Sequence, residues 1–379
     1  MTSSAPLRPR RPDRRGRRGV ALLLLAVVLG AGACAPAPQA TETSSPQAAS
    51  IPPSSAPLPT ESASPSLPPP TATAAPSPVV PADPCGEADP TCQSAAAVQQ
   101  TTGIQFTDPV PCAVQGVTGV NAVPGASGTV TTYCNLQIDS FAPKAGEQLP
   151  VVVMIPGGPV PLGTRAYLWL LARLVAWKGA VVYTADYRSA PQWGGGYPQT
   201  FADVACAVAY ARANAAKIGG DPSRITLLAH SFGGFPGSVV SLSQHDFATD
   251  EPACKAAGAS GRPDAFVGVA AIYGFDHVGA DFLAQMLGGT QQDVPANWAA
   301  TDITTLATAK GHPKPPVLLL AGTADAVAPI ATADEFAADL RAGGITATVT
   351  SVEGADHNTI LADPATLSAV TALIGAKGQ

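Results

Sequence analysis

One serine in this chain stands in a setting that suits a nucleophile. Residues 224–234 (RITLLAHSFGG) run from an apolar stretch into Ala-His-Ser-Phe-Gly, with small residues on both sides of Ser231. The pattern is close to G-x-S-x-G, in which a buried strand turns sharply into a helix and exposes the serine hydroxyl. Small residues are needed there because strand and helix approach each other closely. Since S-x-G also occurs by chance, the interpretation depends on partners for Ser231.

Two downstream residues could serve as those partners. Asp325 follows an apolar run in the segment Gly-Thr-Ala-Asp, and His357 ends the later segment Gly-Ala-Asp-His. A serine hydroxyl is too weakly acidic to attack alone, so His357 would take its proton and later return it to the leaving group. Asp325 would fix the imidazole tautomer and stabilise the imidazolium. The residue types and their order predict a catalytic triad for acyl transfer.

The other candidates for these roles are weaker. Asp356 adjoins His357 in sequence, which generally prevents its carboxylate from reaching the same ring nitrogen well. His230 lies beside the nucleophile, and we interpret it as structural, with its side chain directed away from that of Ser231. The remaining histidines fall in loops or at helix ends, where we expect solvent exposure: His245, His277 and His312.

The segment Ile-Pro-Gly-Gly-Pro at residues 155–159, called here the oxyanion loop, could bind the negative charge of a tetrahedral intermediate. It follows a long apolar run, and its glycines let backbone N–H groups approach a substrate oxygen. The N–H of Phe232, directly after Ser231, should add a donor. Alone, Pro-Gly-Gly-Pro is only a turn. Its position before a helix and upstream of the serine is what favours the functional interpretation.

The elements that must position these residues follow an alternating pattern. Continuous apolar runs alternate with helical patterns, which predicts an α/β fold with a mostly parallel sheet and helices on both faces. A helix is expected at 164–178, ended by Gly179, and another opens at Thr200 with Asp203 three positions on, like a capping box. Asp325 would lie at the carboxyl end of a strand, where parallel sheets build their sites. Besides the strand before Ser231, strands are expected at 149–155, 180–185, 265–272, 317–321 and 346–352.

As an ordered set, the motifs resemble those of the α/β-hydrolase esterases, most of all the carboxylesterase and acetyl-esterase branch. The resemblance covers residues 149–357 and implies the α/β-hydrolase fold, with Gly157 and Gly158 as oxyanion donors. Its motifs are Ile-Pro-Gly-Gly (155–158), Asp-Tyr-Arg (186–188), Gly-Gly-Asp-Pro-Ser-Arg-Ile (219–225), Ala-His-Ser-Phe-Gly-Gly (229–234), Gly-Thr-Ala-Asp (322–325) and Asp-His (356–357).

The chain departs from the pattern of that branch at three places. Pro156 stands where histidine is usual, which removes a side chain that steadies the oxyanion loop. Ala229 replaces the first glycine of the G-x-S-x-G pattern. Pro236 and Gly237 fall early in the helix after Ser231, so we expect that helix to begin irregularly.

These observations predict an exported serine hydrolase that cleaves small-molecule carboxylic esters through an acyl-enzyme, with no cofactor and no metal. The same triad on the same fold also serves amidases, peptidases, lipases and polyester depolymerases. A surface-anchored binding protein without turnover is the alternative from a different class. The segment 275–316, with Phe282, Met286 and Trp298, lies between two predicted strands. It could form a lid over an acyl pocket or a plain crossover helix with loops.

The first 33 residues are typical of an export signal. Arginines precede an apolar run at 20–29, and Ala-Gly-Ala at 31–33 offers a small-residue cleavage site. Cleavage there would leave Cys34 at the new N-terminus, which resembles a bacterial lipoprotein signal. Ala31 stands where leucine is usual, and a plain secretory peptide is the alternative. A diacylglyceryl group on Cys34 would anchor the protein at the outer face of the cell membrane; otherwise it would be secreted.

The composition after the signal changes twice. Residues 34–84 are almost entirely Pro, Ala, Ser and Thr, which predicts a disordered, extended stalk, followed by a catalytic domain at 85–379. The net charge of −6 has no long run of one sign beyond the signal, so the chain carries no nucleic-acid footprint. Nothing in the sequence indicates an oligomeric state.

Six cysteines remain when Cys34 is set aside, an even number that suits disulfides in an exported protein. Metal binding is the alternative use of these cysteines, but the sequence contains no C-x-x-C pair to favour it. Sequential pairing is the simplest of the allowed connectivities. It joins Cys85 with Cys92, Cys112 with Cys134, and Cys206 with Cys254.

Overall fold

The computed structural model describes Ser94 and the ranges 97–112, 121–124, 130–159, 162, 164–256 and 258–376. By its contacts the chain divides into two units, Met1–Pro84 and Cys85–Gln379. The expected signal at 1–33, Cys34, the expected stalk at 34–84 and the expected Cys85–Cys92 disulfide lie outside the described residues. Among the described residues, no helix is long and apolar enough to cross a membrane.

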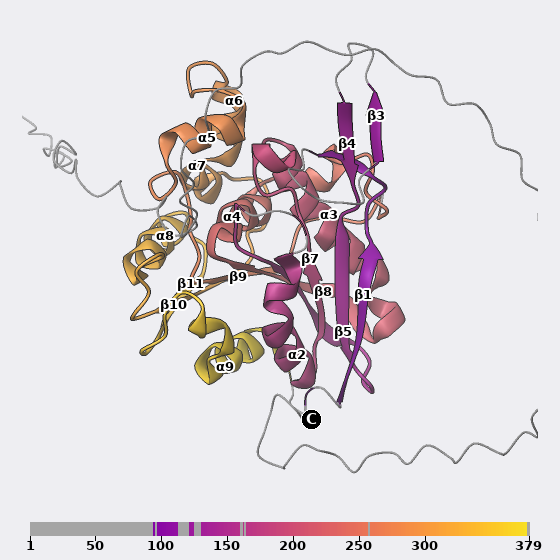
Figure 1. The fold of residues 1–379 in the computed structure, drawn as a ribbon. Coiled ribbons are helices and arrows are strands. Elements are labelled where there is room, and N and C mark those ends of the chain that lie inside the picture. Colours follow the sequence, from indigo (N-terminus) through magenta and orange to yellow (C-terminus); the bar gives the residue numbers. More distant parts are fainter. Residues whose placement is uncertain are drawn as a thin grey trace, which may run out of the picture. The chain divides into compact units, whose positions relative to one another are not determined.

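An eight-stranded sheet forms the core of the second unit (Figure 1). Its strand order is β1-β5-β7-β6-β8-β9-β10-β11, and neighbours from β7 onward run parallel, whereas β1 and β5 join antiparallel at one edge. This confirms the mostly parallel sheet. The strands are β1 (Val98–Gln105), β5 (Gln137–Pro143), β6 (Leu149–Ile155), β7 (Val181–Ala185), β8 (Gly220–His230), β9 (Ala265–Val269), β10 (Val317–Gly322) and β11 (Ala347–Val352).

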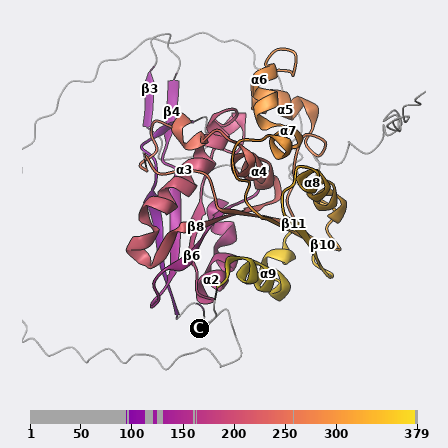
Figure 2. The same ribbon diagram turned by 180° about the vertical axis from the view of Figure 1, so that it is seen from behind.

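Helices cover both faces of the sheet, as expected (Figures 1 and 2). On one face α2 (Trp169–Trp177) packs beside α9 (Pro364–Ile374), and Leu171 and Val370 belong to the same apolar cluster. The other face carries α3 (Gln199–Asn214), α4 (Gly234–Leu242) and α8 (Ile330–Ala342), whose apolar side chains share the larger cluster. Because both faces are covered, the central strands are continuous apolar runs rather than alternating ones.

Two expectations about helix starts need correction. The helix expected at 164–178 begins as a 3-10 turn, η1 (Thr164–Leu168), before α2. The capping box at Thr200 is wrong: α3 begins at Gln199, after Pro198, and has no side-chain cap. Asp203 lies in the buried interior and accepts hydrogen bonds from Arg188. Its carboxylate therefore forms an ion pair with a distant residue and does not cap the helix.

A second, three-stranded antiparallel sheet has the order β2-β4-β3. Its strands are β2 (Val110–Cys112), β3 (Asn121–Pro124) and β4 (Val130–Cys134). The Cys112–Cys134 disulfide joins β2 to β4. The Cys206–Cys254 disulfide ties α3 to the segment after η5 (Phe247–Asp250) and closes a 48-residue separation, worth roughly 4 kcal/mol on the chain-entropy model. Two of the three expected pairings are therefore present.

The segment 275–316 runs from β9 to β10 and carries α5 (Ala280–Leu287), α6 (Pro295–Thr301) and α7 (Ile303–Thr308). These helices gather at the end of the domain opposite α2 and α9 (Figures 1 and 2). The remaining short turns are η2 (Pro191–Trp193), η3 (Ala215–Ile218), η4 (Ser231–Gly233) and η6 (Thr359–Ala362).

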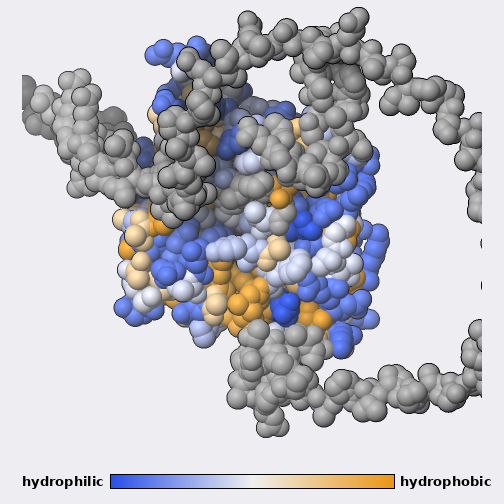
Figure 3. All heavy atoms as spheres, in the orientation of Figure 1, coloured by the Kyte–Doolittle hydropathy of each residue, from blue (hydrophilic) through white to orange (hydrophobic). Residues whose placement is uncertain are grey.

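The surface of the face seen in Figure 3 is mostly mixed in polarity, with apolar side chains gathered toward its lower part. Between α2 and α9 a groove of about 590 Å³ is lined by Leu174, Trp177 and Leu367 among others.

Candidate active site

Ser231 lies where β8 ends, on a strained turn into the next helix. Its backbone φ is 54°, in the left-handed region, which costs a residue other than glycine about 1–3 kcal/mol. After the 3-10 turn η4 the chain continues directly into α4, so the helix does begin irregularly, with Pro236 in its first turn. The turn brings the side chain of Ser231 to the carboxyl edge of the sheet, where it is half-buried.

The small residues around Ser231 are set by close contacts. A Cβ atom on Gly233 would lie 2.5 Å from the carbonyl oxygen of Pro156, so only glycine fits there. The methyl group of Ala229, which replaces the usual glycine, is accommodated by a second glycine. A Cβ on Gly237 would lie 3.0 Å from the Cβ of Ala229, so the missing side chain in α4 leaves room for the added one in β8.

The structure brings the three predicted triad residues into one hydrogen-bonded chain. Nδ1 of His357 lies 2.9 Å from Oδ2 of Asp325, and Nε2 lies 2.8 Å from Oγ of Ser231. With the Nδ1 proton donated to the carboxylate, Nε2 is left to accept the serine proton. The two partners come from loops after β10 and β11, at the same edge as the end of β8.

The carboxylate of Asp325 is held by more than the histidine. Its side chain is fully buried, and its other oxygen, Oδ1, accepts backbone N–H groups of Val327 and Ala328, each at 2.8 Å. Three donors therefore hold this buried carboxylate in place, with one oxygen toward His357.

The competing residues have other partners. Oδ1 of Asp356 accepts the N–H groups of Thr359 and Asn358, and these hydrogen bonds lower its pKa. The carboxylate of Asp356 therefore binds the backbone of its own loop. Of the three distant histidines, only His245 is exposed as expected; the other two are half-buried. They contact other groups: His245 contacts Asp250, His277 contacts Glu335, and His312 contacts the carbonyl of Leu242.

The oxyanion loop lies directly against Ser231. A Cβ on Gly157 would lie 2.8 Å from the Cβ of Ser231, and a Cβ on Gly158 would lie 3.2 Å from the ring of Phe232. A side chain at position 157 would therefore push the loop away from Ser231, whereas one at position 158 would require only a small shift of its neighbours. The loop therefore lies beside Ser231 and next to Phe232, the residue whose N–H is the third expected donor.

His230, interpreted from the sequence as structural, contacts the residue that is the candidate base. Its ring packs against that of His357, with centroids 5.0 Å apart, and its Nε2 lies 2.9 Å from the backbone oxygen of His357. Burial lowers its pKa to about 4, so the ring is neutral and its Nε2–H donates to that carbonyl. The sequence shows that His230 adjoins Ser231, but it gives no signal for the hydrogen-bond partner, which lies 127 residues away.

Aromatic side chains of the segment 275–316 pack near the nucleophile turn. The ring of Phe232 meets that of Phe282, from α5, edge to face with centroids 5.5 Å apart. Phe275 meets Trp298 in the same way at 5.0 Å. The segment 275–316 thus contacts the residue that follows Ser231. No group of three or more His, Cys, Asp or Glu side chains in the described part of the chain could hold a metal ion.

The fold and the arrangement of these side chains are those of an α/β-hydrolase. The BD-FAE family model matches residues 138–340, more than half of the 379 residues. The chain therefore belongs to the BD-FAE family, a family of α/β-hydrolase esterases.

Curated relatives include several esterases. Esterase LipC of Mycobacterium tuberculosis is 30% identical over 204 residues, covering 51% of this chain and 48% of the relative. Carboxylesterase NlhH of the same species is 37% identical over 107 residues, covering 28% of this chain and 33% of the relative. The chain thus spans about half the length of LipC and about a third of the length of NlhH.

Solved structures share the fold. Est2 of Thermogutta terrifontis with butyrate bound has a TM-score of 0.52 at 20% identity, covering 68% of this chain and 94% of that one. A truncated carbohydrate esterase from gut microbiota has a TM-score of 0.55 at 18% identity, covering 74% of this chain and 96% of that one.

Proposed function

We propose that this protein hydrolyses carboxylic esters, with Ser231 as nucleophile, His357 as general base and acid, and Asp325 as the group that orients the imidazole. The observation that carries the proposal is the hydrogen-bonded chain through both nitrogens of His357, 2.8 Å to Ser231 and 2.9 Å to Asp325. The names of the relatives, esterase and carboxylesterase, support the same reaction.

The reaction follows from this geometry in two halves. Oγ of Ser231 attacks the ester carbonyl carbon while His357 takes its proton, and the tetrahedral oxyanion is stabilised by N–H groups of Gly157, Gly158 and Phe232. The C–O bond to the alcohol breaks as His357 returns the proton to it, leaving an acyl-serine. Water then attacks the acyl carbon, His357 takes the proton of the water, and the acid is released as Ser231 regains its proton.

The contact between Phe282 and Phe232 supports a short acyl group as the preferred one. The ring from α5 lies next to the residue that flanks the nucleophile, so it would limit the room beside the acyl carbon. Est2 with butyrate bound is a relative in fold whose ligand is a short acid. In this proposal the segment 275–316 acts as a lid over the acyl site.

The function is tested with chromogenic esters of increasing acyl length. Wild type should hydrolyse some short ester, and Ser231→Ala should remove that activity. Ser223→Ala is the matched control, because Ser223 lies on the same strand but is exposed. Equal turnover by Ser231→Ala and wild type would refute the proposal. A wild type that binds esters without turnover would instead favour a binding protein.

We also propose that the protein is exported and anchored through a lipid on Cys34. The support is the sequence pattern of residues 1–34 alone. Replacing Cys34 with serine should move the protein from the membrane fraction to the medium. Retention of the Cys34→Ser variant in the membrane fraction would contradict lipid anchoring at that residue.

A further inference from the structure

We propose that Tyr187 is the positioning residue of the oxyanion loop and supplies the support that Pro156 cannot provide. The proposal rests on the proposed ester hydrolysis at Ser231. It concerns a residue that touches neither the substrate nor the three residues of the hydrogen-bonded chain, but holds the backbone expected to bind the oxyanion.

The phenol of Tyr187 reaches the loop directly. Its hydroxyl donates to the carbonyl oxygen of Pro156 at 3.1 Å, and a Cβ on Gly158 would lie 3.3 Å from that hydroxyl. The side chain is buried, and burial raises its pKa, so the hydroxyl keeps its proton and remains a donor. One hydroxyl therefore contacts the residue before the two glycines and lies against the second of them.

Pro156 offers few other means of support. Proline has no N–H and no polar side-chain atom, so its carbonyl is the one polar group by which the residue can be held. That carbonyl also faces the glycine two residues after Ser231, because a Cβ on Gly233 would lie 2.5 Å from it. A shift of Pro156 would move both the loop and the turn that carries the nucleophile.

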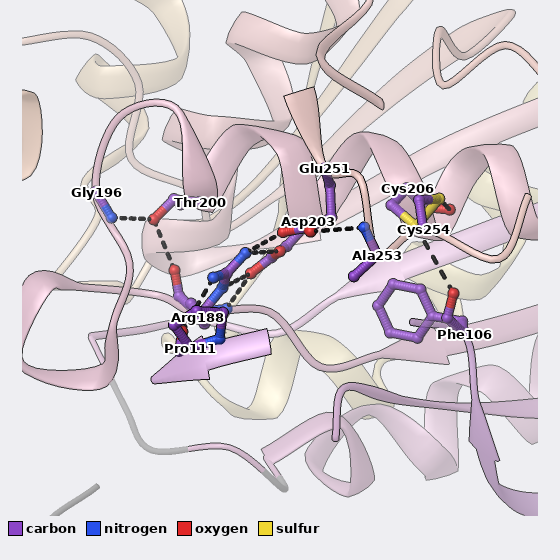
Figure 4. Close-up of polar contacts among 10 residues, drawn as sticks. All are labelled: Phe106, Pro111, Arg188, Gly196, Thr200, Asp203, Cys206, Glu251, Ala253 and Cys254. Carbon is purple, nitrogen blue, oxygen red and sulfur yellow. Dashed lines mark hydrogen bonds and ion pairs between the residues drawn. A yellow bond between two sulfur atoms is a disulfide. The ribbon is translucent and has the colours of Figure 1, made fainter. Parts of the chain in front are cut away.

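The residues directly before and after Tyr187 are each held by ion pairs. Before it, the carboxylate of Asp186 pairs with Nη1 of Arg165 at 2.6 Å. After it, the guanidinium of Arg188 donates to both oxygens of Asp203, at 2.8 and 2.7 Å, and pairs with Glu251 (Figure 4). The backbone on each side of the phenol is therefore clamped, which limits where its hydroxyl can point.

A disulfide links the two segments whose carboxylates hold Arg188. Asp203 lies three residues before Cys206 on α3, and Glu251 lies three residues before Cys254, its disulfide partner (Figure 4). The two carboxylates that hold Arg188 thus belong to covalently linked segments. We call this set (Arg188, Asp203, Glu251 and the Cys206–Cys254 bond) the brace.

Tyr187→Phe tests the proposal because it removes one hydroxyl and leaves the ring. We expect kcat for a short ester to fall roughly 5- to 30-fold, the equivalent of about 1–2 kcal/mol, with KM within about twofold. Tyr273→Phe is the matched control. Its hydroxyl is also fully buried but has no hydrogen-bond partner among the described residues, so kcat should not change.

The outcomes separate the two proposals. Wild type without esterase activity, or Ser231→Ala with full activity, refutes the function itself. An active wild type whose Tyr187→Phe variant matches Tyr273→Phe in kcat, or changes only in KM, overturns the positioning role alone. Should Tyr187→Phe fail to fold, Glu251→Gln loosens the brace from one side. It should lower kcat without changing KM, and an unchanged kcat would equally overturn the proposal.

Discussion

The neutral ring of His230 donates from Nε2 to the backbone carbonyl of His357, across 2.9 Å. The bond joins the last residue of β8, directly before Ser231, to the loop that carries the catalytic-base candidate. The two imidazole rings pack with their centroids 5.0 Å apart. His230 therefore contacts both the ring and the backbone of His357. Both partners of the proposed proton transfer are thus linked through His230.

This relationship predicts a loss of stability in mild acid. Burial lowers the pKa of His230 from 6.5 to about 4, so the unfolded chain binds the proton more readily than the folded one between those values. The stabilisation is present above pH 6.5 and falls as pH drops toward 4, by about 2–3 kcal/mol between pH 7 and 4.5. Urea unfolding at both pH values measures it. His230→Gln should lose much of this pH dependence, and an unchanged slope would show that His230 is not its source.

Gly157→Ala should impair catalysis far more than stability. The new Cβ would lie 2.8 Å from the Cβ of Ser231, so the oxyanion loop must move away from the nucleophile. Loss of one oxyanion donor typically costs about 10²-fold or more in kcat. Gly279→Ala is the control, because a Cβ there meets nothing within 4 Å. Steady-state kinetics that show equal kcat for the two variants would place the oxyanion donors elsewhere.

Asp325→Asn should lower kcat by roughly 10³–10⁴-fold, because an amide cannot hold the required histidine tautomer. Asp356→Asn, at the neighbouring carboxylate that binds its own loop, should remain within a few-fold of wild type. Comparing kcat/KM for the two variants on one short ester decides between them. Comparable losses in both would mean that Asp356 shares the role.

Phe282→Ala should shift acyl preference toward longer chains. Removing the ring that meets Phe232 opens space on the α5 side of the site, so kcat/KM for an octanoate ester should rise relative to that for a butyrate ester. The exposed neighbour Asp281 gives the control Asp281→Ala, which should keep the wild-type ratio. If the ratio does not move in Phe282→Ala, α5 does not border the acyl group.

Local patterns predicted much of the architecture from the sequence. The strand 149–155 matches β6, because a run of apolar residues buried on both faces has few other structures to adopt. The positions of Ser231, Asp325 and His357 followed from motif order, and the structure brings their side chains together. Backbone signals such as glycines and apolar runs are local, so they can be read without knowing the contacts.

What the sequence did not indicate depends on distant partners. Strands β1 and β5, which pair antiparallel with each other, were not predicted. For β1 the reason is that its residues alternate in burial over only part of the strand. Asp203 looked like a helix cap until its partner Arg188 was placed beside it. Tyr187 appeared only as part of a motif, because nothing local shows that its hydroxyl meets the carbonyl of Pro156.

The most direct test of the proposed function is covalent labelling with a fluorophosphonate, followed by mass mapping of the adduct. We expect one phosphonyl group per chain, on the peptide that contains Ser231, and none in Ser231→Ala, while Ser223→Ala is labelled like wild type. An active enzyme that carries the adduct on another residue, or that is not labelled at all, would contradict Ser231 as the nucleophile.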